Sequence, residues 1–379
     1  MIYFDNSATT FPDKDVLECF FNTTKNYGGN PSSIHGLGRK ASVTLEEARN
    51  ICSDCLGVRP REIVFTSSGT ESNNTAIKSI ALQYINQKKH IITTSVEHAS
   101  VYNTCKQLEE WGFSVTYLSV NKTGHINIEE LKRAIRSDTI LVSIMHVNSE
   151  LGSIQPIKEI GELLKNYPAI TFHVDAVQAF GKVDIDITNW NIDLLSLSSH
   201  KFHSPRGAGI LYVREGVYLP PLLVGGGQEY GQRSGTENVA SIVAMSKAME
   251  KQCEHIERNN SYLNSLKNHL LSGLRDIPNC HINSSTENNN APHIINFSIE
   301  GILSDDLIRS LEKYQIFVSK SSACSSSNAN PSRVLTACGL NKGIANSAIR
   351  VSFSTHNTLE EVESFLFALI REIFSKAEV

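Results

Sequence analysis

Short apolar runs alternate with longer amphipathic segments through roughly the first two-thirds of the chain. The runs have the length and the branched residues of buried strands, and most of the segments between them have helical spacing. This alternation is typical of βαβ units, so we expect an α/β fold with a mostly parallel sheet and helices on both faces. The predicted strands are Glu62–Phe65, Lys89–Thr93, Ser114–Leu118, Ile140–Ile144, Ile170–Val174, Leu194–Leu197 and Ala208–Tyr212, and the predicted helices are Glu71–Gln87, Ser100–Trp111, Ile128–Ile135 and Ile157–Asn166.

The last third of the sequence predicts a second, smaller α+β domain. A glycine-rich loop precedes it, and a long continuous helical pattern carries the chain out of the first domain. The loop is Val224–Gly235, the helical pattern is Glu237–Leu274, and the later elements are a polar loop at Asn283–Pro292, strands at Ile294–Ser298 and Ile316–Val318, and an amphipathic helix at Leu359–Lys376.

Composition narrows the class of protein. Hydrophobic residues make up 40% and charged residues 20% of the 379 residues, which is the balance of a folded globular chain. The net charge of −4 provides no basic field, so we expect no direct nucleic-acid or membrane binding. The N-terminus has no signal-peptide pattern, and no stretch approaches the ~20 apolar residues of a membrane span. Because 8 cysteines are too few for a disulfide framework, we expect a cytoplasmic protein.

A lysine and an aspartate lie close to the ends of two predicted strands. Lys201 comes shortly after Leu194–Leu197, and Asp175 directly follows Ile170–Val174. Ligands of open α/β sheets bind beyond the carboxyl ends of strands. There a lysine can form a Schiff base, and an acid can keep a pyridinium nitrogen protonated, as in pyridoxal phosphate enzymes. Taken singly, the two residues are equally consistent with a solvated lysine and a helix N-cap.

Two further features fit a bound phosphorylated ring. The segment Phe65–Ser72 runs from a strand into a helix and is rich in small and hydroxyl residues, so backbone N–H groups and the helix dipole can meet an anion there. His98 follows the strand Lys89–Thr93 and offers an imidazole that could stack on a ring. In isolation, the first feature is also that of an ordinary helix cap and the second that of a structural histidine.

A series of motifs completes the pattern, from YFDNSATT at Tyr3 onward: GNPSSIHGLG, EIVFTSSGTESNN, VEHASV, HVDAVQ, LSSHKFHSPRGAG, GGGQEYGQRSGTEN, SSACSSS and AIRVSFS. In this order they resemble the cysteine desulfurases, pyridoxal phosphate enzymes of the class V aminotransferase family with the fold-type I architecture. The resemblance covers essentially the whole chain. It implies a large pyridoxal phosphate-binding domain over residues 14–256 and a small domain, with the catalytic cysteine loop, over residues 1–13 and 257–379.

The resemblance implies a role for each residue around the cofactor ring. Lys201 would be the Schiff-base lysine, and Asp175 the partner of the pyridinium nitrogen. Gln178 would hydrogen-bond the phenolic oxygen, and His98 would stack on the ring. Ser149 occupies the position of a family asparagine whose amide contacts the cofactor or the substrate. The shorter hydroxyl leaves a gap there that water can fill.

The resemblance also implies where the phosphate and the substrate lie. The phosphate-binding residues would be Gly69, Thr70, Ser198 and His200, with Thr236 contributed by the other subunit of a homodimer. Arg350 would grip the carboxylate of L-cysteine, which suits its bidentate fork. No metal is implied, and Cys52-x-x-Cys55 lacks the second pair or the histidines of a zinc site.

The catalytic cycle that the resemblance implies converts L-cysteine to L-alanine. Lys201 would remove the α-proton, and His98 would carry the proton of the substrate thiol. Cys324 would accept the sulfur as a persulfide and pass it to a protein acceptor. Its segment, Lys320–Ser332, matches the family members with the long catalytic loop, and its Ser, Ala and Asn content predicts mobility.

Several alternatives stay open from the sequence. A small-molecule aminotransferase of the same fold needs no thiol, so Cys324 argues against it. Selenocysteine lyase activity would use the same residues. A catalytically silent sulfur-transfer partner predicts loss of Lys201 or Asp175, and both are present. Family acceptors are iron–sulfur scaffolds, tRNA thiolation enzymes or thiamine pathways. Because the chain ends soon after its last helix, we expect a dedicated acceptor such as a tRNA thiolation enzyme.

Overall fold

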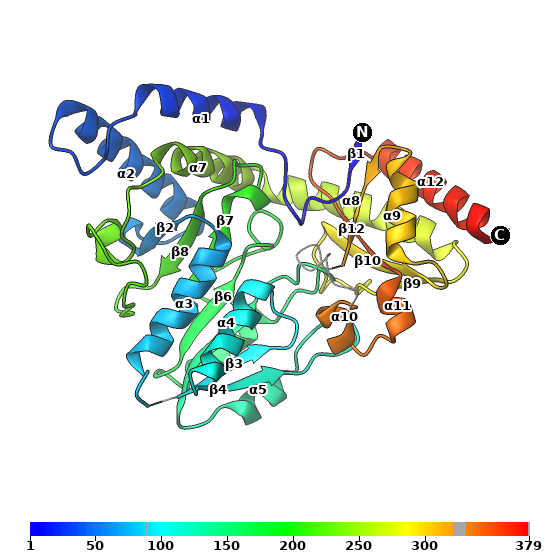
Figure 1. Ribbon diagram of the computed structural model, residues 1–379, viewed down its shortest axis with the longest axis horizontal. Helices are drawn as coiled ribbons and strands as arrows, with labels where there is room; N and C mark the ends of the chain where they lie inside the picture. The colour runs from blue at the N-terminus through cyan, green and yellow to red at the C-terminus, as the bar shows by residue number, and fades with distance from the viewer. Residues whose placement is uncertain (88, 322–330, 378–379) are drawn as a thin grey trace.

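A seven-stranded sheet forms the centre of the larger part of the protein, seen here as a computed structural model that describes residues 1–87, 89–321 and 331–377 (Figure 1). The strand order is β2-β8-β7-β6-β5-β3-β4, and all neighbours are parallel except β8, which runs antiparallel to β2 and β7. The predicted α/β fold with a mostly parallel sheet is confirmed. The strands are β2 Ile63–Thr66, β3 His90–Thr94, β4 Ser114–Leu118, β5 Thr139–Met145, β6 Thr171–Asp175, β7 Leu194–Ser198 and β8 Gly209–Val213.

Helices cover both faces of this sheet because its strands are apolar on both sides. Val64 packs with α3 and α4 on one face, and its neighbour Phe65 packs with α2, α6 and α7 on the other. Fully buried strands of this kind are typical of sheets with helices on both faces. The helices are α1 Lys14–Asn26, α2 Gly36–Leu56, α3 Gly69–Gln83, α4 Ala99–Glu110, α5 Ile128–Ala134, α6 Ile157–Leu164 and α7 Val239–Glu254.

A four-stranded antiparallel sheet, in the order β12-β13-β10-β9, forms the second part. It has its own apolar core, and the N-terminal strand β1 pairs beside it with β11. The domain limits drawn from the sequence stay predictions. The remaining elements are β1 Ile2–Tyr3, α8 Ile256–Arg275, β9 Cys280–Ile282, β10 Ile294–Ile299, α9 Ser304–Glu312, β11 Ile316–Phe317, β12 Ser319–Lys320, α10 Arg333–Ala337, α11 Lys342–Asn346, β13 Ala348–Ser352 and α12 Leu359–Ala377.

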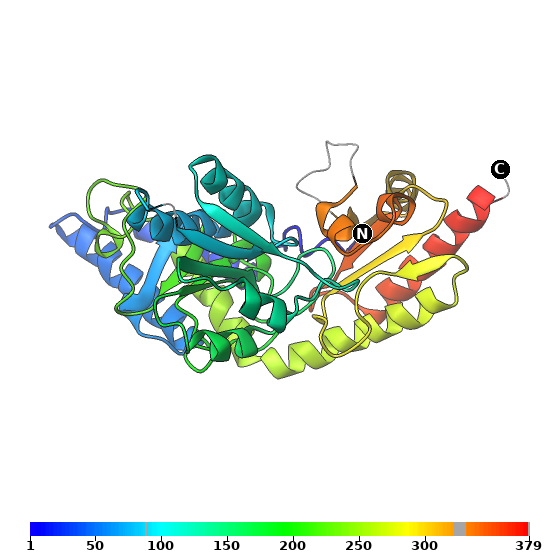
Figure 2. The same cartoon turned by 90° about the horizontal axis from the view of Figure 1, so that it is seen from below.

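The single helical pattern predicted over Glu237–Leu274 is wrong, because the chain forms two helices. His255, with φ −130° and ψ 18°, leaves the helical conformation between α7 and α8. Met245 of α7 packs into the core of the large sheet, whereas Leu266 of α8 packs into the core of the small sheet. The break lets each helix turn its apolar side to a different core, and Figure 2 shows the two helices passing from one part to the other.

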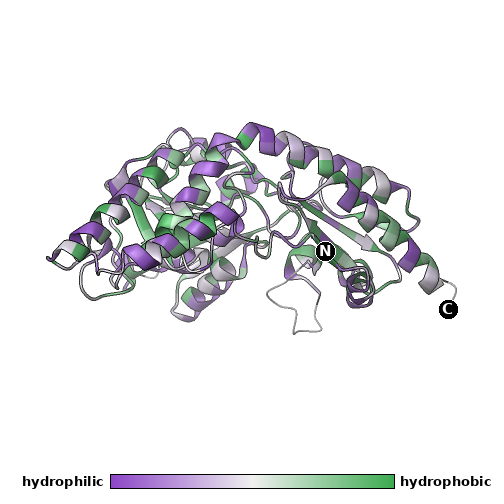
Figure 3. Cartoon of the chain, turned by 90° about the horizontal axis from the view of Figure 1, so that it is seen from above, coloured by the Kyte–Doolittle hydropathy of each residue, from purple (hydrophilic) through white to green (hydrophobic). Residues whose placement is uncertain are grey.

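The outer helices are amphipathic. Figure 3 shows hydrophilic and hydrophobic residues alternating along them. Within the described ranges, none of the helices combines the length and the apolar character that crossing a bilayer requires.

Candidate active site

A cavity of about 530 Å³ lies at the carboxyl ends of the central strands and is closed in part by residues of the small sheet. Its size is that of a small-molecule or cofactor site. It brings together most of the residues predicted from the sequence: Gly69, Thr70, His98, Ser149, Asp175, Gln178, Ser198, His200, Lys201 and Arg350. Thr236 is exposed and does not line it, and Cys324 lies outside the described residues.

Lys201 ends a short 3-10 helix, Ser199–Lys201, which directly follows β7. Its Nζ donates to the backbone carbonyls of Ser7, at 2.6 Å, and Ala8, at 2.8 Å. Beneath it, Lys182 donates to the carbonyl of Lys201 at 2.8 Å. Burial, with the nearby charge of Lys201, lowers the pKa of Lys182 to about 7. The strand end and the N-terminal segment thus hold the Lys201 amine in the cavity.

Asp175 is the last residue of β6 and is 5% exposed. Its Oδ2 accepts a hydrogen bond from Asn73 Nδ2 at 2.7 Å, and its Oδ1 accepts one from the backbone N–H of Val177 at 3.0 Å. These two hydrogen bonds fix the orientation of the Asp175 side chain. A carboxylate held in this way can pair with a protonated ring nitrogen.

His98 is the N-cap of α4. Its Nδ1 lies 2.8 Å from Ser100 Oγ and accepts from the Ser100 backbone N–H at 3.2 Å. Burial lowers the pKa of His98; the Asp175 carboxylate opposes this shift, while the positive charges of Lys201 and Arg333 add to it. His98 therefore lies in the cavity as a neutral imidazole.

The start of α3 forms an anion-binding corner. Ser68 caps the helix, and Gly69 is its first residue. A Cβ on Gly69 would lie 2.7 Å from Val177 Cγ2, so only glycine lets the helix terminus pack this closely. His200, which also lines the cavity, is held neutral because burial and the charge of Lys201 lower its pKa to about 3. N–H groups, hydroxyls and the positive end of the helix dipole suit a phosphate here.

These groups fit pyridoxal phosphate. The corner at Gly69 suits the phosphate, Asp175 suits a protonated ring nitrogen, and the amine of Lys201 suits the aldehyde carbon. Gln178 gives a further sign of a missing partner: its Nε2 donates to the Ser7 carbonyl at 2.8 Å, while its buried Oε1 has no hydrogen-bond partner among the described residues. A polar ligand would satisfy such an atom.

Arg350 reaches the cavity from β13 of the small sheet and is 3% exposed. Its Nη2 lies 2.8 Å from Asp5 Oδ1, and its Nη1 donates to the Ser149 carbonyl at 3.0 Å. The buried Nε has no hydrogen-bond partner within the described ranges. A guanidinium that is held in place and still has N–H groups to donate can bind the carboxylate of a substrate.

The sequence analysis missed two residues that tie α10 to the cavity. Arg333 donates to the backbone carbonyls of Ser95 and Glu97, just before His98, and its guanidinium lies 3.9 Å from the Tyr102 ring centroid. Ser332 Oγ donates to Glu150 Oε2 at 2.5 Å. Burial raises the pKa of Glu150 to about 7. The only sequence signal was their position, because Ser332 ends the segment Lys320–Ser332 and Arg333 directly follows it.

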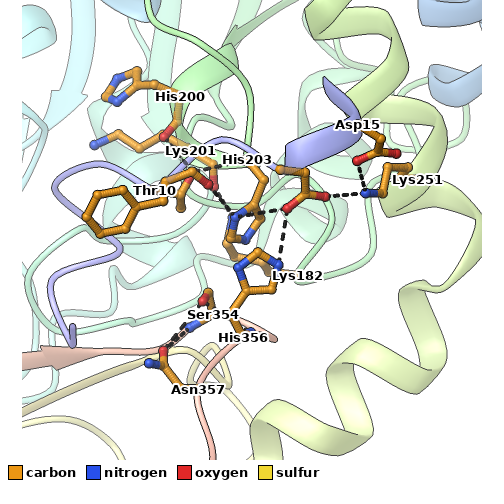
Figure 4. Close-up of polar contacts among 12 residues, drawn as sticks. Thr10, Asp15, Lys182, His200, Lys201, His203, Lys251, Ser354, His356 and Asn357 are labelled. Atoms are coloured by element: carbon orange, nitrogen blue, oxygen red, sulfur yellow. Dashed lines mark hydrogen bonds and ion pairs between the residues drawn. The ribbon is translucent and has the colours of Figure 1, made fainter. Parts of the chain in front are cut away.

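A second polar cluster lies next to the segment that carries Lys201 (Figure 4). The ring centroids of His203 and His356 lie 4.5 Å apart. One nitrogen of each ring and one carboxylate oxygen of Asp13 all lie within 4.8 Å of one another. Although burial raises the pKa of Asp13, hydrogen bonds from His356 and Lys251 hold it well below its usual value. Because Lys251 already neutralises Asp13 at 2.5 Å, the cluster is an ion-pair network that joins the N-terminal segment, the Lys201 region and the residues after β13.

Comparison with protein families and curated proteins gives a consistent result. The family model described as aminotransferase class-V matches residues 2–365. A "NifS/IcsS protein homolog" from Lactobacillus delbrueckii subsp. bulgaricus is 49% identical over 379 residues, covering 99% of this chain and 98% of the relative. A "Cysteine desulfurase IscS" from Methanosarcina thermophila is 47% identical, covering 99% and 92%.

Solved structures show the same likeness. A structure titled "NIFS-LIKE PROTEIN" superimposes with a TM-score of 0.93 at 40% identity, covering 99% of both chains. Another, titled "SspA in complex with cysteine", has a TM-score of 0.83 at 38% identity and covers 94% of this chain and 100% of that one.

Proposed function

The chain belongs to the class V aminotransferase family and acts as a cysteine desulfurase, and we propose that its cavity binds pyridoxal 5'-phosphate and L-cysteine and that Cys324 accepts the sulfur. The observation that carries the proposal is the convergence of Lys201, Asp175 and the first turn of α3 on one cavity, with Arg350 facing them from the small sheet. The reaction needs these groups: an amine for the aldehyde of the cofactor, an acid for its ring nitrogen, a helix N-terminus for its phosphate and a guanidinium for the substrate carboxylate.

The cofactor, when bound, supplies an electron sink that makes the α-proton of an amino acid easier to remove. Gly69, Thr70, Ser198 and His200 would hold its phosphate, and Asp175 would keep its ring nitrogen protonated. His98 would lie against the ring, and the amide Nε2 of Gln178, which has a second hydrogen beside the one donated to the Ser7 carbonyl, would donate to the phenolic oxygen. Lys201 would attach it covalently through Nζ.

The substrate would lie between the two sheets. Arg350 binds the carboxylate of L-cysteine, which places the α-carbon toward Lys201. The amine of Lys201 then takes the α-proton. The Ser149 side chain lies at the same wall of the cavity, where its backbone carbonyl already accepts from Arg350 at 3.0 Å.

Two observations support Cys324 as the sulfur acceptor, although it lies outside the described residues. Ser321 lines the cavity on the N-terminal side of residues 322–330, and Arg333 and Val334 line it on the C-terminal side. Residues on both sides of Cys324 in the sequence thus contribute to the wall of the cavity. The thiolate would attack the substrate sulfur, so that an S–S bond forms while the Cβ–S bond of the substrate breaks. The electron pair of the broken bond goes to Cβ, which takes up a proton and becomes the methyl group of L-alanine, and the persulfide remains on Cys324.

A homodimer with shared sites is part of the proposal. Large apolar side chains are exposed on α2 and its flanks and on the segment before α7, including Ile34 at 91% and Val224 at 85%. Exposed apolar groups of this kind are typical of interfaces. Thr236 is exposed and does not line the cavity of its own subunit. This position suits a role in the phosphate site of the other subunit. Sedimentation of the holoenzyme, and rescue of Thr236→Ala by mixing with Lys201→Ala, would test this arrangement.

We also propose a protein acceptor, either an iron–sulfur scaffold or a tRNA thiolation enzyme, in the cytoplasm. The described cysteines are all free thiols, as a reducing compartment favours. Incubation with labelled L-cysteine followed by co-purification would identify the acceptor by the label that it carries.

The function itself is tested with purified holoenzyme, L-cysteine and a thiol reductant. We expect equal amounts of L-alanine and sulfide. Amino-group transfer to an added 2-oxo acid, without sulfide, would instead indicate an aminotransferase. Turnover of L-selenocysteine with none of L-cysteine would indicate a selenocysteine lyase.

A further inference from the structure

Asn73 connects two groups of the cavity that come from different strand ends. It lies in α3 and is 1% exposed. Its Nδ2 donates to Asp175 Oδ2 at 2.7 Å and to Ser100 Oγ at 2.9 Å. Ser100 Oγ in turn lies 2.8 Å from Nδ1 of His98. A continuous hydrogen-bonded chain therefore runs from the Asp175 carboxylate to the His98 imidazole.

The direction of each hydrogen bond in this chain is fixed by its ends. A carboxylate only accepts, so Asn73 must turn its NH2 group, not its oxygen, toward Asp175. The second hydrogen of the same NH2 group goes to Ser100 Oγ, which thus accepts. The hydroxyl hydrogen of Ser100 is then left to donate to His98 Nδ1.

A second donor points at the same nitrogen. The backbone N–H of Ser100, which cannot accept, donates to His98 Nδ1 at 3.2 Å. A ring nitrogen that accepts two hydrogen bonds carries no hydrogen of its own. Because burial lowers the pKa of His98, the neutral ring is the relevant form, and its single N–H lies on Nε2.

We propose that Asn73 and Ser100 are positioning residues that hold His98 in the Nε2–H tautomer, so that His98 serves the substrate as a hydrogen-bond donor and not as a base. The inference deepens the proposed function and rests on it. A neutral His98 cannot take the substrate thiol proton at Nε2, which already has a hydrogen, or at Nδ1, which faces Ser100. The expectation that His98 carries that proton is thereby replaced.

The tautomer is measured directly by ¹⁵N NMR of histidine-labelled wild-type holoenzyme, with His98→Gln used to identify the resonances of His98. We expect Nε2 to show a directly bound hydrogen and Nδ1 to show none. A hydrogen on Nδ1 in the wild-type holoenzyme would overturn the proposal. L-Alanine formation in the same sample tests the desulfurase function separately, so the two failures are distinguishable.

Variants test whether Ser100 has more than a structural role. In Ser100→Ala we expect a roughly tenfold lower kcat, a KM for L-cysteine changed less than about twofold and an intact cofactor spectrum, because only the orientation of one hydrogen-bond donor, the Nε2–H of His98, is lost. A hydrogen on Nδ1 should become detectable, and Ser100→Thr should restore both readouts. Ser79→Ala, which removes a fully buried hydroxyl of α3 outside this chain of hydrogen bonds, is the matched control.

The outcome of the series decides the proposal even if one variant fails to fold. Asn73→Ala removes the donor to Ser100 without touching His98, and we expect the same appearance of Nδ1–H with a smaller loss of kcat. If both Ser100→Ala and Asn73→Ala keep the wild-type tautomer, or if either has wild-type kcat with an altered tautomer, the positioning role is wrong.

Discussion

The Arg350 guanidinium and the Asp5 carboxylate lie 2.8 Å apart where β13 meets the N-terminal segment. Asp5 balances part of the buried charge of Arg350 and fixes one arm of its fork, while Nη1 is held by the Ser149 carbonyl. The fork is thus oriented before any substrate arrives. Among its remaining donors, the buried Nε has no partner among the described residues.

Replacing the guanidinium of Arg350 with the ammonium group of a lysine tests the role of Arg350 in substrate binding. In Arg350→Lys we expect the KM for L-cysteine to rise by about tenfold or more, because an ammonium cannot form the paired hydrogen bonds of a guanidinium. Steady-state L-alanine formation measures the effect. Arg309→Lys, at an exposed position of α9, should behave like the wild type. An unchanged KM in Arg350→Lys would remove Arg350 from the substrate site.

Covalent attachment of the cofactor is predicted at Lys201 alone. Lys201→Ala should fold and bind pyridoxal phosphate without a covalent link, since the phosphate corner and Asp175 remain. Borohydride reduction of the wild type followed by peptide mapping should place the adduct on Lys201. Lys165→Ala, at an exposed site of the same domain, is the control. An adduct on Lys182, a half-buried lysine that donates to the Lys201 carbonyl, would contradict the assignment.

Ser149→Asn introduces the asparagine that the resemblance to the cysteine desulfurases implies for this position, and we expect it to be tolerated. The Ser149 contact with Arg350 uses the backbone carbonyl, so the longer side chain leaves that hydrogen bond in place. We expect kcat/KM within about tenfold of the wild type, with Ser149→Ala as the comparison. A larger loss, more than ~1.4 kcal/mol of barrier, would show that the cavity is shaped for serine.

The stability of the protein should depend on pH through Glu97, which is 1% exposed. Burial raises its pKa to about 8. Between the unfolded value near ~4.3 and about 8, the unfolded chain loses this proton while the folded chain keeps it. The free energy of unfolding therefore falls as pH rises through this window, by at most about 1.4 kcal/mol per pH unit.

Glu97→Gln should remove this dependence because the amide is neutral throughout. Denaturant unfolding at several pH values between about 5 and 8 measures the difference from the wild type, which should widen with pH. Glu110→Gln, at an exposed position of α4, should follow the wild-type curve. Parallel wild-type and Glu97→Gln curves would show that Glu97 is ionised in the folded protein.

Much of the larger sheet could be predicted because its strands are short apolar runs. Each predicted strand lies within one residue of an observed one, as with Ile170–Val174 and β6. The antiparallel direction of β8 could not be predicted, since an apolar run carries no sign of direction. The break at His255 was missed because both flanking segments keep helical spacing. β13 was missed although Ala348–Ser352 is fully buried, because its arginine interrupts the apolar pattern.

The predicted site residues that meet in the cavity all stand next to strand ends or in recognisable motifs. Asn73 and Ser100 were missed because a polar residue inside a helix usually faces water, and only the tertiary fold brings both to Asp175 and His98. Arg333 was missed for a related reason: its partners are the backbone carbonyls of Ser95 and Glu97, which leave no mark on the sequence.

The most direct test of the central claim is to locate the sulfur after a single turnover. Wild-type holoenzyme is treated with L-cysteine without reductant, digested and analysed by mass spectrometry, with Cys324→Ala and Cys253→Ala in parallel. Cys253 is an exposed thiol and so controls for non-specific transfer. We predict one added sulfur on Cys324 in the wild type and in Cys253→Ala, and neither a persulfide nor appreciable L-alanine in Cys324→Ala. A persulfide on another cysteine, or normal L-alanine formation by Cys324→Ala, would contradict the account.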